Sequence, residues 1–247
     1  MDLGATELVE RFKTEAARSG AVVYEAKDAK DAGDYVLKVA QERGVKHIVK
    51  SKSMLAEEIG LREQLENAGI EVRETDIAEW ITQLARERPA HAEYLVPPKT
   101  IEQVAELISK ATGEQLEAEP KALSIAARRA LRQSCIVADM GISEASIAIA
   151  ETGTLIIMSN EGNDRLVAVL PPIHVTMLDR EELVSNMEDA TAKLKLLSRT
   201  VTDGKMPRYI TYITGRNTTA DIPKALMARA QGPEEEHIVL VDRAASK

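Results

Sequence analysis

Two polar turns near the middle of the chain carry residue types that bind small ligands. The first is Glu151–Thr154 and the second is Asn160–Arg165, and apolar runs rich in β-branched residues flank both. Gly153 and Gly162 allow a positive φ or a close approach of the backbone to a ligand. A guanidinium such as that of Arg165 binds a carboxylate or phosphate through two parallel hydrogen bonds. The set suits an anionic ligand, and the expected contacts are Thr152, Gly153, Thr154, Asn160, Glu161, Gly162 and Arg165.

A third polar segment, Thr214–Ile222, follows a predicted strand and adds Thr219 and Asp221 to the candidate ligand-binding residues. We expect this segment and the two turns to converge at one edge of a sheet, close to His174. The alternative is that all three are ordinary turns whose polar groups satisfy one another, because Gly, Asn and Thr are also the residues that turns require.

His174 and Glu151 are the candidate catalytic residues. His174 lies on a predicted strand beside the polar turns and is the best candidate for a general base, although a hydrogen-bonded core histidine is the alternative. Glu161 is a further candidate, since a carboxyl group near another carboxyl group or near apolar surface has a raised pKa. The four histidines show no i, i+4 metal spacing, so the sequence predicts no metal site.

The only cysteine, Cys135, excludes an internal disulfide and any Cys-x-x-Cys site for zinc or an iron–sulfur cluster in this chain. Cys135 begins a short apolar run and has no histidine beside it in sequence. We therefore expect a buried structural thiol rather than a nucleophile.

The elements that must position these residues alternate between helices and strands. Glycines follow the predicted helices Thr6–Ser19, Lys30–Arg43 and Met54–Ala68, and the strands expected between and after them are Ala21–Tyr24, Val45–Val49 and Ile70–Glu74. This rhythm predicts parallel strands joined by helical crossovers. Four further runs look like strands, with at least one antiparallel hairpin among them because their linkers are short: Ile147–Ala150, Leu155–Met158, Leu166–Leu170 and Ile173–Leu178. Later in the chain we expect a helix at Arg180–Ser198 and strands at Tyr209–Ile213 and His237–Val241.

Polar residues follow two of the predicted parallel strands. Lys50–Ser53 stands between a strand and a helix start, where a phosphate or carboxylate could bind backbone amides. The simpler interpretation is that Ser53 caps the helix and the lysines are solvated. Glu74–Asp76 follows the next strand, and there Asp76 is expected to cap a helix, with contact to a ribose hydroxyl as the alternative. Thr100 and Gln103 have the spacing of a capping box.

The composition limits the class of partner. The chain has 247 residues, a net charge of −8 and a pI near 5.2, and its basic residues are scattered along helices. We expect no nucleic-acid partner and no membrane insertion, because no apolar run reaches the roughly 18–20 residues that span a bilayer. No signal peptide is visible, so a cytoplasmic location is expected. The sequence leaves open whether the chain forms a homo-oligomer.

An ordered set of motifs resembles the LUD domain of bacterial lactate-utilisation proteins. The set is Asp139–Ser143, AETGT at Ala150–Thr154, NEGN with Arg165, LPPIH ending at His174, ITG at Ile213–Gly215, TADI at Thr219–Ile222 and GPEEEHIVLVD at Gly232–Asp242. Residues Met54–Leu61 and Gly69–His91 also look like that family, and Glu71–His91 resembles its larger, iron–sulfur member.

The resemblance implies a fold, namely the α/β fold shared by ribose-5-phosphate isomerase, glucosamine-6-phosphate deaminase and CoA transferases. We expect a mixed, largely parallel sheet flanked by helices, in a single LUD domain over residues 1–247. Residues 1–49 would form an α/β preface packed beside the rest, and no ferredoxin-like domain is expected in this chain.

The resemblance also implies a function, namely a component of an L-lactate-oxidising electron-transfer complex with other lactate-utilisation subunits as partners and a small anion as ligand. The chain would then be a subunit of an L-lactate dehydrogenase complex, with no cofactor of its own. Iron–sulfur clusters are expected only in a missing C-terminal part or a partner subunit. The alternatives are a stand-alone sugar-phosphate isomerase, cyclo-ligase or CoA-transferase-like enzyme, or a non-catalytic module that binds an anion or nucleotide.

Overall fold

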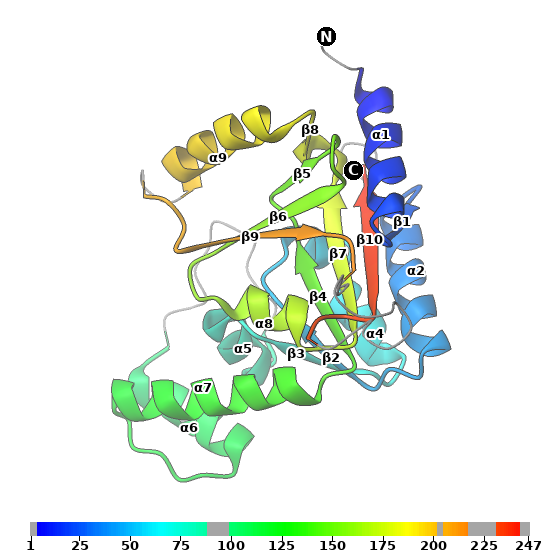
Figure 1. Ribbon diagram of the computed structural model, residues 1–247. Helices are drawn as coiled ribbons and strands as arrows, with labels where there is room; N and C mark the ends of the chain where they lie inside the picture. Colours follow the sequence, from blue (N-terminus) through cyan, green and yellow to red (C-terminus); the bar gives the residue numbers. More distant parts are fainter. Residues whose placement is uncertain (1–3, 88–98, 202–204, 217–230, 243–247) are drawn as a thin grey trace.

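The central element is a six-stranded sheet, called sheet A, in which every pair of neighbouring strands is parallel (Figure 1). The computed structural model describes residues 4–87, 99–201, 205–216 and 231–242. The strand order is β1-β10-β7-β4-β2-β3. The strands are β1 (Val22–Glu25), β2 (His47–Lys50), β3 (Glu71–Glu74), β4 (Met140–Glu144), β7 (Ile173–Asp179) and β10 (Glu235–Val241). The predicted α/β class with a parallel sheet is confirmed, and β1 and β2 belong to this sheet.

Four strands form a second sheet, called sheet B, in the order β8-β5-β6-β9. They are β5 (Ile147–Ile149), β6 (Thr154–Ser159), β8 (Leu183–Val184) and β9 (Tyr209–Thr214). β6 pairs antiparallel with β5 and with β9, which confirms the predicted hairpin, while β5 and β8 are parallel. The sequence predicts parallel and antiparallel pairs in one mixed sheet, whereas the antiparallel pairs lie in sheet B and sheet A is parallel.

Helices cover both sheets. They are α1 (Ala5–Arg18), α2 (Ala29–Glu42), α3 (Met54–Glu58), α4 (Leu61–Asn67), α5 (Ile77–Leu84), α6 (Ile101–Thr112), α7 (Pro120–Val137), α8 (Asn163–Val169) and α9 (Met187–Val201). One face of sheet A packs against α2, α3 and α4. The other face packs against α1, sheet B, α7 and α8. α9 covers the outer side of sheet B (Figure 1).

Three predicted elements are wrong. Leu166–Val169 lie in α8, and Leu170 follows as its C-cap, so this segment is not a strand. Val167 and Ala168 are buried while Val169 and Leu170 are exposed, which is the one-sided burial of a surface helix. The predicted helix Met54–Ala68 is two helices, broken where Gly60 adopts a φ of 65°. The predicted helix Arg180–Ser198 begins with a 3-10 turn and β8, since Leu183 and Val184 pair with β5, and α9 starts only at Met187.

The predicted helix caps are confirmed. Ser53 Oγ accepts a hydrogen bond from the backbone N–H of Ala56 at the start of α3, and Asp76 accepts from two N–H groups of α5. Thr100 and Gln103 form the capping box that opens α6. In the described residues, no helix is both long and apolar enough to cross a bilayer.

The packing of α8 on sheet A predicts that Gly141→Ala destabilises the protein. A Cβ at Gly141 would lie 2.0 Å from the carbonyl oxygen of Val167, so β4 and α8 would have to separate. Forcing an atom into such a contact costs about 3 kcal/mol of unfolding free energy. Urea unfolding measures this cost, and Gly4→Ala is the control because nothing lies within 4 Å of a Cβ there. Equal stability of the two variants would contradict this packing.

Candidate functional site

The carboxyl ends of the strands of sheet A form a charged edge. β1, β2, β3, β4 and β7 end at Glu25, Lys50, Glu74, Glu144 and Asp179. Ligands of open α/β sheets bind outside this edge, because the strand ends and the helix starts point their polar groups there. At this edge, a dense group of polar contacts surrounds the ends of β2 and β3.

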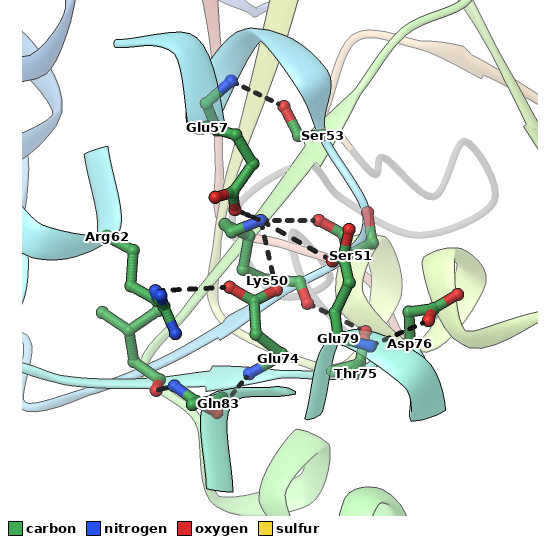
Figure 2. A network of polar contacts seen from close by, with 12 residues as sticks. Lys50, Ser51, Ser53, Glu57, Arg62, Glu74, Thr75, Asp76, Glu79 and Gln83 are labelled. Atoms are coloured by element: carbon green, nitrogen blue, oxygen red, sulfur yellow. Dashed lines mark hydrogen bonds and ion pairs between the residues drawn. The ribbon is translucent and has the colours of Figure 1, made fainter. Parts of the chain in front are cut away.

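Lys50 is fully buried at the end of β2 and contacts three carboxyl groups (Figure 2). Its Nζ atom lies 3.0 Å from Glu57, 3.1 Å from Glu74 and 4.0 Å from Glu79. These partners come from α3, β3 and α5, so the ammonium joins three elements. The expectation that both lysines of Lys50–Ser53 are solvated is therefore wrong for Lys50, whereas Lys52 is exposed.

Two further side chains fix Glu74 at the end of β3. Arg62 of α4 places its Nε atom 3.9 Å from Glu74 Oε1. Gln83 of α5 accepts a hydrogen bond from the backbone N–H of Glu74 and donates one to the carbonyl of Val72. The carboxyl group of Glu74 is thus held between two helices and β2. We call Lys50, Glu57, Arg62, Glu74 and Glu79 the Lys50 cluster.

Burial changes the acidity of the cluster. It raises the pKa of Glu74 to about 8, and the neighbouring carboxylates Glu79 and Glu57 act in the same direction against the opposing effect of Lys50. Burial also raises the pKa of Glu79. For Lys50, burial alone would lower the pKa, but Glu74, Glu79 and Glu57 together raise it above the ordinary value of a lysine. At neutral pH Lys50 is therefore charged and Glu74 is mostly protonated.

The amino terminus of α3 already has a carboxylate. Glu144 Oε2, from the end of β4, accepts hydrogen bonds from Ser53 Oγ at 2.7 Å and from the backbone N–H of Leu55 at 3.0 Å. These are the groups at which the sequence allowed a phosphate or carboxylate ligand to bind. An external anion would have to displace Glu144 there, so α3 offers it no free amino terminus.

The turn Asn160–Arg165 meets the Lys50 cluster through Thr75. Asn163 Nδ2 donates to Thr75 Oγ1 at 3.0 Å, and Thr75 Oγ1 in turn donates to the carbonyl of Lys50 at 3.0 Å. Glu161 lies near Asp76, and its pKa is raised by burial and by that carboxylate. The structure thus joins this turn with both strand-end segments that the sequence singled out.

Other residues of that turn have local partners. Asn160 Oδ1 accepts a hydrogen bond from the backbone N–H of Arg208, and Gly162 has a φ of 78° and donates to Ser159 Oγ. The guanidinium of Arg165 lies 6.0 Å above the ring of Tyr209 and is exposed. Arg165 is therefore a solvent-accessible cation beside the charged edge.

The turn Glu151–Thr154 lies at the opposite end of β6 and packs on α1. A Cβ at Gly153 would lie 2.3 Å from the backbone nitrogen of Ala16. The hydroxyls of Thr152, Thr154 and Thr214 form a chain with separations of 2.7 and 2.8 Å, and Glu151 is an exposed partner of Arg11 at 3.5 Å. The structure therefore does not bring the two turns together.

His174 lies inside the molecule on β7, in a row of polar side chains that crosses three strands. Ser143 Oγ is 2.8 Å from His174 Nε2, and His174 Nδ1 is 2.8 Å from Glu236 Oε2. Thr176 donates to the other oxygen of Glu236. All four side chains are buried, so both ring nitrogens have partners and the histidine does not reach the turns.

Several predictions lie outside the described residues, namely Thr219, Asp221 and His91. Within the described part of the chain, no group of three His, Cys, Asp or Glu side chains could hold a metal ion. Cys135 is buried in α7, as predicted, and burial raises the pKa of its thiol to about 11. A thiol of this kind does not fit the role of an iron–sulfur ligand.

Sequence inspection missed Glu57, Arg62, Glu79 and Glu144 as parts of this site. Glu57, Arg62 and Glu79 are spaced along predicted helices like ordinary surface charges, and Glu144 follows an apolar strand. The available signal was the pair Lys50 and Glu74, since charges of opposite sign that end two successive parallel strands are expected to meet at one edge.

Comparison with known proteins decides the family. A family model described as "LUD domain" matches residues 9–241. The chain belongs to the LUD-domain family. Relatives of this LUD domain include lactate utilization protein B from Oceanobacillus iheyensis, 35% identical over 96% of this chain and 48% of that protein. The Bacillus subtilis protein of the same name is 38% identical over 93% of this chain and 47% of its own length.

Two further similarities complete the comparison. A protein of Escherichia coli named "uncharacterized electron transport protein YkgF" is 32% identical over 96% of this chain and 48% of its own length. The LUD domain thus spans about half the length of the curated relatives it matches. The crystal structure of a DUF162 family protein from Deinococcus radiodurans shares the fold, with a TM-score of 0.53 at 13% identity over 97% of this chain and 99% of the other.

The Lys50 cluster predicts that Glu74→Gln gains stability relative to the parent LUD domain as the pH rises. The pKa of Glu74 is about 8 in the folded chain and near 4.5 in the unfolded chain, so folding binds a proton between these values. The stability of the parent chain therefore falls from about pH 4.5 to about pH 8, and the neutral glutamine avoids that loss. Relative to the parent, the unfolding free energy of the variant should rise by on the order of 2–4 kcal/mol between pH 5 and pH 9.

Urea unfolding at pH 5, 7 and 9 measures this gain. The matched control is Glu71→Gln on the same strand, where the carboxylate is half exposed and its pKa is lowered by Arg73. This control should show no gain as the pH rises. A Glu74→Gln variant whose stability relative to the parent is the same at pH 5 and pH 9 would rule out a protonated Glu74.

Proposed function

We propose that this LUD domain acts in lactate utilisation, as a component of an electron-transfer complex that oxidises L-lactate to pyruvate. The observation that carries the proposal is the identity of 35% and 38% to two proteins named lactate utilization protein B, over at least 93% of the chain. The relative named as an electron transport protein supports the electron-transfer part. Other lactate-utilisation subunits would be its partners.

The small anion of the proposal would bind at the charged edge of sheet A, beside the turn Asn160–Arg165. Arg165 supports this placement because it is exposed and its guanidinium can bind a carboxylate in bidentate fashion. The turn is tied to the ends of β2 and β3 through Asn163 and Thr75. The catalytic roles of His174 and Glu151 stay predictions.

The electron chemistry would come from outside this chain. An iron–sulfur cluster is usually held by four thiolates, whereas Cys135 is the only cysteine in the sequence and its thiol is buried with a raised pKa. The residues present do not fit such a cluster. A part of a longer protein or a partner subunit would therefore supply it, and the LUD domain would contribute binding and protein contacts.

Loss of the gene should abolish growth on L-lactate in the source organism. The proposal requires this because the complex would lack one of its components. Growth on L-lactate and L-lactate-dependent dye reduction in cell extracts are the measurements, with growth on pyruvate as the control for general fitness. Unchanged growth and dye reduction would reject the lactate role. Turnover of a sugar phosphate or acyl-CoA by the purified chain would then support the alternative of a stand-alone enzyme.

Arg165→Ala should weaken the binding of L-lactate without unfolding the chain. Loss of a charge-assisted contact costs about 1.5–3 kcal/mol of binding free energy. Loss of an exposed side chain should change the unfolding free energy by less than about 0.5 kcal/mol. Calorimetric titration and thermal melting measure the two effects. Arg18→Ala, an exposed arginine paired with Glu15 on α1, is the matched control. Full affinity in Arg165→Ala would remove Arg165 from the site.

A further inference from the structure

The charges of the Lys50 cluster do not balance if every group is ionised. Lys50 and Arg62 contribute two positive charges, whereas Glu57, Glu74 and Glu79 contribute three negative charges. The side chains are largely removed from water, with exposed fractions of 0% for Lys50, 3% for Glu74, 13% for Glu79 and Arg62, and 23% for Glu57. An unbalanced charge at such a depth is costly, so the neutral state of the cluster is the one that holds one extra proton.

The extra proton belongs to Glu74 and Glu79. Glu74 is the deepest of the three carboxyl groups, and burial disfavours its charged form most strongly. Burial raises the pKa of Glu79 as well, and both carboxyl groups contact Lys50 Nζ, so the extra proton is assigned to this pair. Glu57 is the most exposed of the three carboxyl groups that contact Lys50.

The elements packed around Glu74 and Glu79 each contribute a charged group to the charge balance. The charged groups that face Glu74 and Glu79 are Lys50 from β2, Glu57 from α3, Arg62 from α4 and Asp76 at the start of α5. Glu161, from the turn before α8, faces Asp76. The negative groups Asp76 and Glu161 thus lie at the same edge, with Glu161 on the turn that carries Arg165. A further negative charge at this edge would therefore add to carboxylates that already repel one another.

A hydroxyl beside the Lys50 cluster has no hydrogen-bond partner among the described residues. Ser51 Oγ is fully buried and makes no hydrogen bond to any residue that the structure describes. The residue follows Lys50, and its carbonyl oxygen lies 3.4 Å from Lys50 Nζ (Figure 2). A buried hydroxyl without a partner costs free energy, so a group that accepts its hydrogen bond would stabilise this edge. The hydroxyl of Ser51 gives this edge a donor for a ligand oxygen beside the carboxyl pair.

We propose that this edge is a proton-coupled anion site, in which a small 2-hydroxy or 2-oxo carboxylate binds together with one proton taken up by Glu74 and Glu79. Binding of a negative ligand next to the pair favours its protonated form, because like charges disfavour ionisation. With that proton in place the charges of the cluster balance, and Lys50 and Arg62 can complement the ligand. The identity of the anion in this inference rests on the proposed function. The inference adds that a proton is taken up when the anion binds.

Calorimetric titration of the full chain tests the coupling, with sodium L-lactate and sodium pyruvate as the probes. Repeating each titration in two buffers of different protonation enthalpy gives the number of protons taken up for each anion bound. We expect close to one proton in the parent chain at pH 9, where Glu74 is ionised before the anion binds, and an affinity that falls up to tenfold for each pH unit above pH 8. In Glu74→Gln the anion should still bind, with little proton uptake and a flatter pH dependence. Glu71→Gln should behave as the parent does.

Infrared titration of the ligand-free chain gives a second readout that does not depend on the anion. A protonated carboxylic acid absorbs apart from carboxylates, and its band should disappear as the pH rises through about 8 in the parent chain. The band should be absent in Glu74→Gln. Absence of the band in the parent, binding without net proton uptake, or equal uptake in the parent and Glu74→Gln would each overturn the inference.

The two proposals fail in different ways. Growth on L-lactate that depends on the gene, combined with binding that takes up no proton, would overturn this inference and leave the proposed function in place. Proton-coupled binding of L-lactate or pyruvate by a chain whose loss does not affect growth would overturn the proposed function alone. Failure of both anions to bind the parent chain would overturn the anion site.

Discussion

The burial of one ammonium group organises the charged edge of this LUD domain. Lys50 lies where β2 ends, and an unpaired charge at that depth would be prohibitively costly. Carboxyl groups from α3, β3 and α5 must therefore reach it, which fixes how these three elements meet (Figure 2). The same requirement leaves one carboxyl group too many, so the site holds a proton. The buried ammonium of Lys50 thus accounts both for the way these elements pack and for the proton held among the carboxyl groups.

Much of the fold could be predicted from the sequence because local signals and tertiary packing agree. The helices that end in glycine and the apolar strands between them specify the parallel sheet, and the caps at Ser53, Asp76 and Thr100 lie where their side chains predict them. The failure at Leu166–Leu170 has a physical reason. Its β-branched residues favour a strand, but Gly141 leaves space for a helix to pack on β4, and such a contact cannot be inferred from the segment itself.

The candidate site was harder to predict, because burial decides the chemistry of a charged residue and sequence does not show burial. Lys50 and Lys52 are two residues apart in the same loop region, yet one is enclosed by carboxyl groups and the other is exposed. The turn Asn160–Arg165 meets the ends of β2 and β3 through Asn163 and Thr75, instead of the expected turn Glu151–Thr154 and His174. Its partner turn Glu151–Thr154 was placed at the wrong end of β6, because two turns joined by a six-residue strand necessarily face opposite ways.

The buried row of Ser143, His174 and Glu236 has a consequence for how the sheet assembles. Its three residues come from β4, β7 and β10, and each is satisfied only by its neighbours across the sheet. The apolar side chains that alternate with them could occupy one another's positions in the core. Burial of apolar surface alone therefore specifies the alignment of parallel strands weakly. A shift of any one strand by a single residue would turn a polar side chain toward the apolar face and leave its partners without hydrogen bonds. The row therefore selects one alignment of β4, β7 and β10.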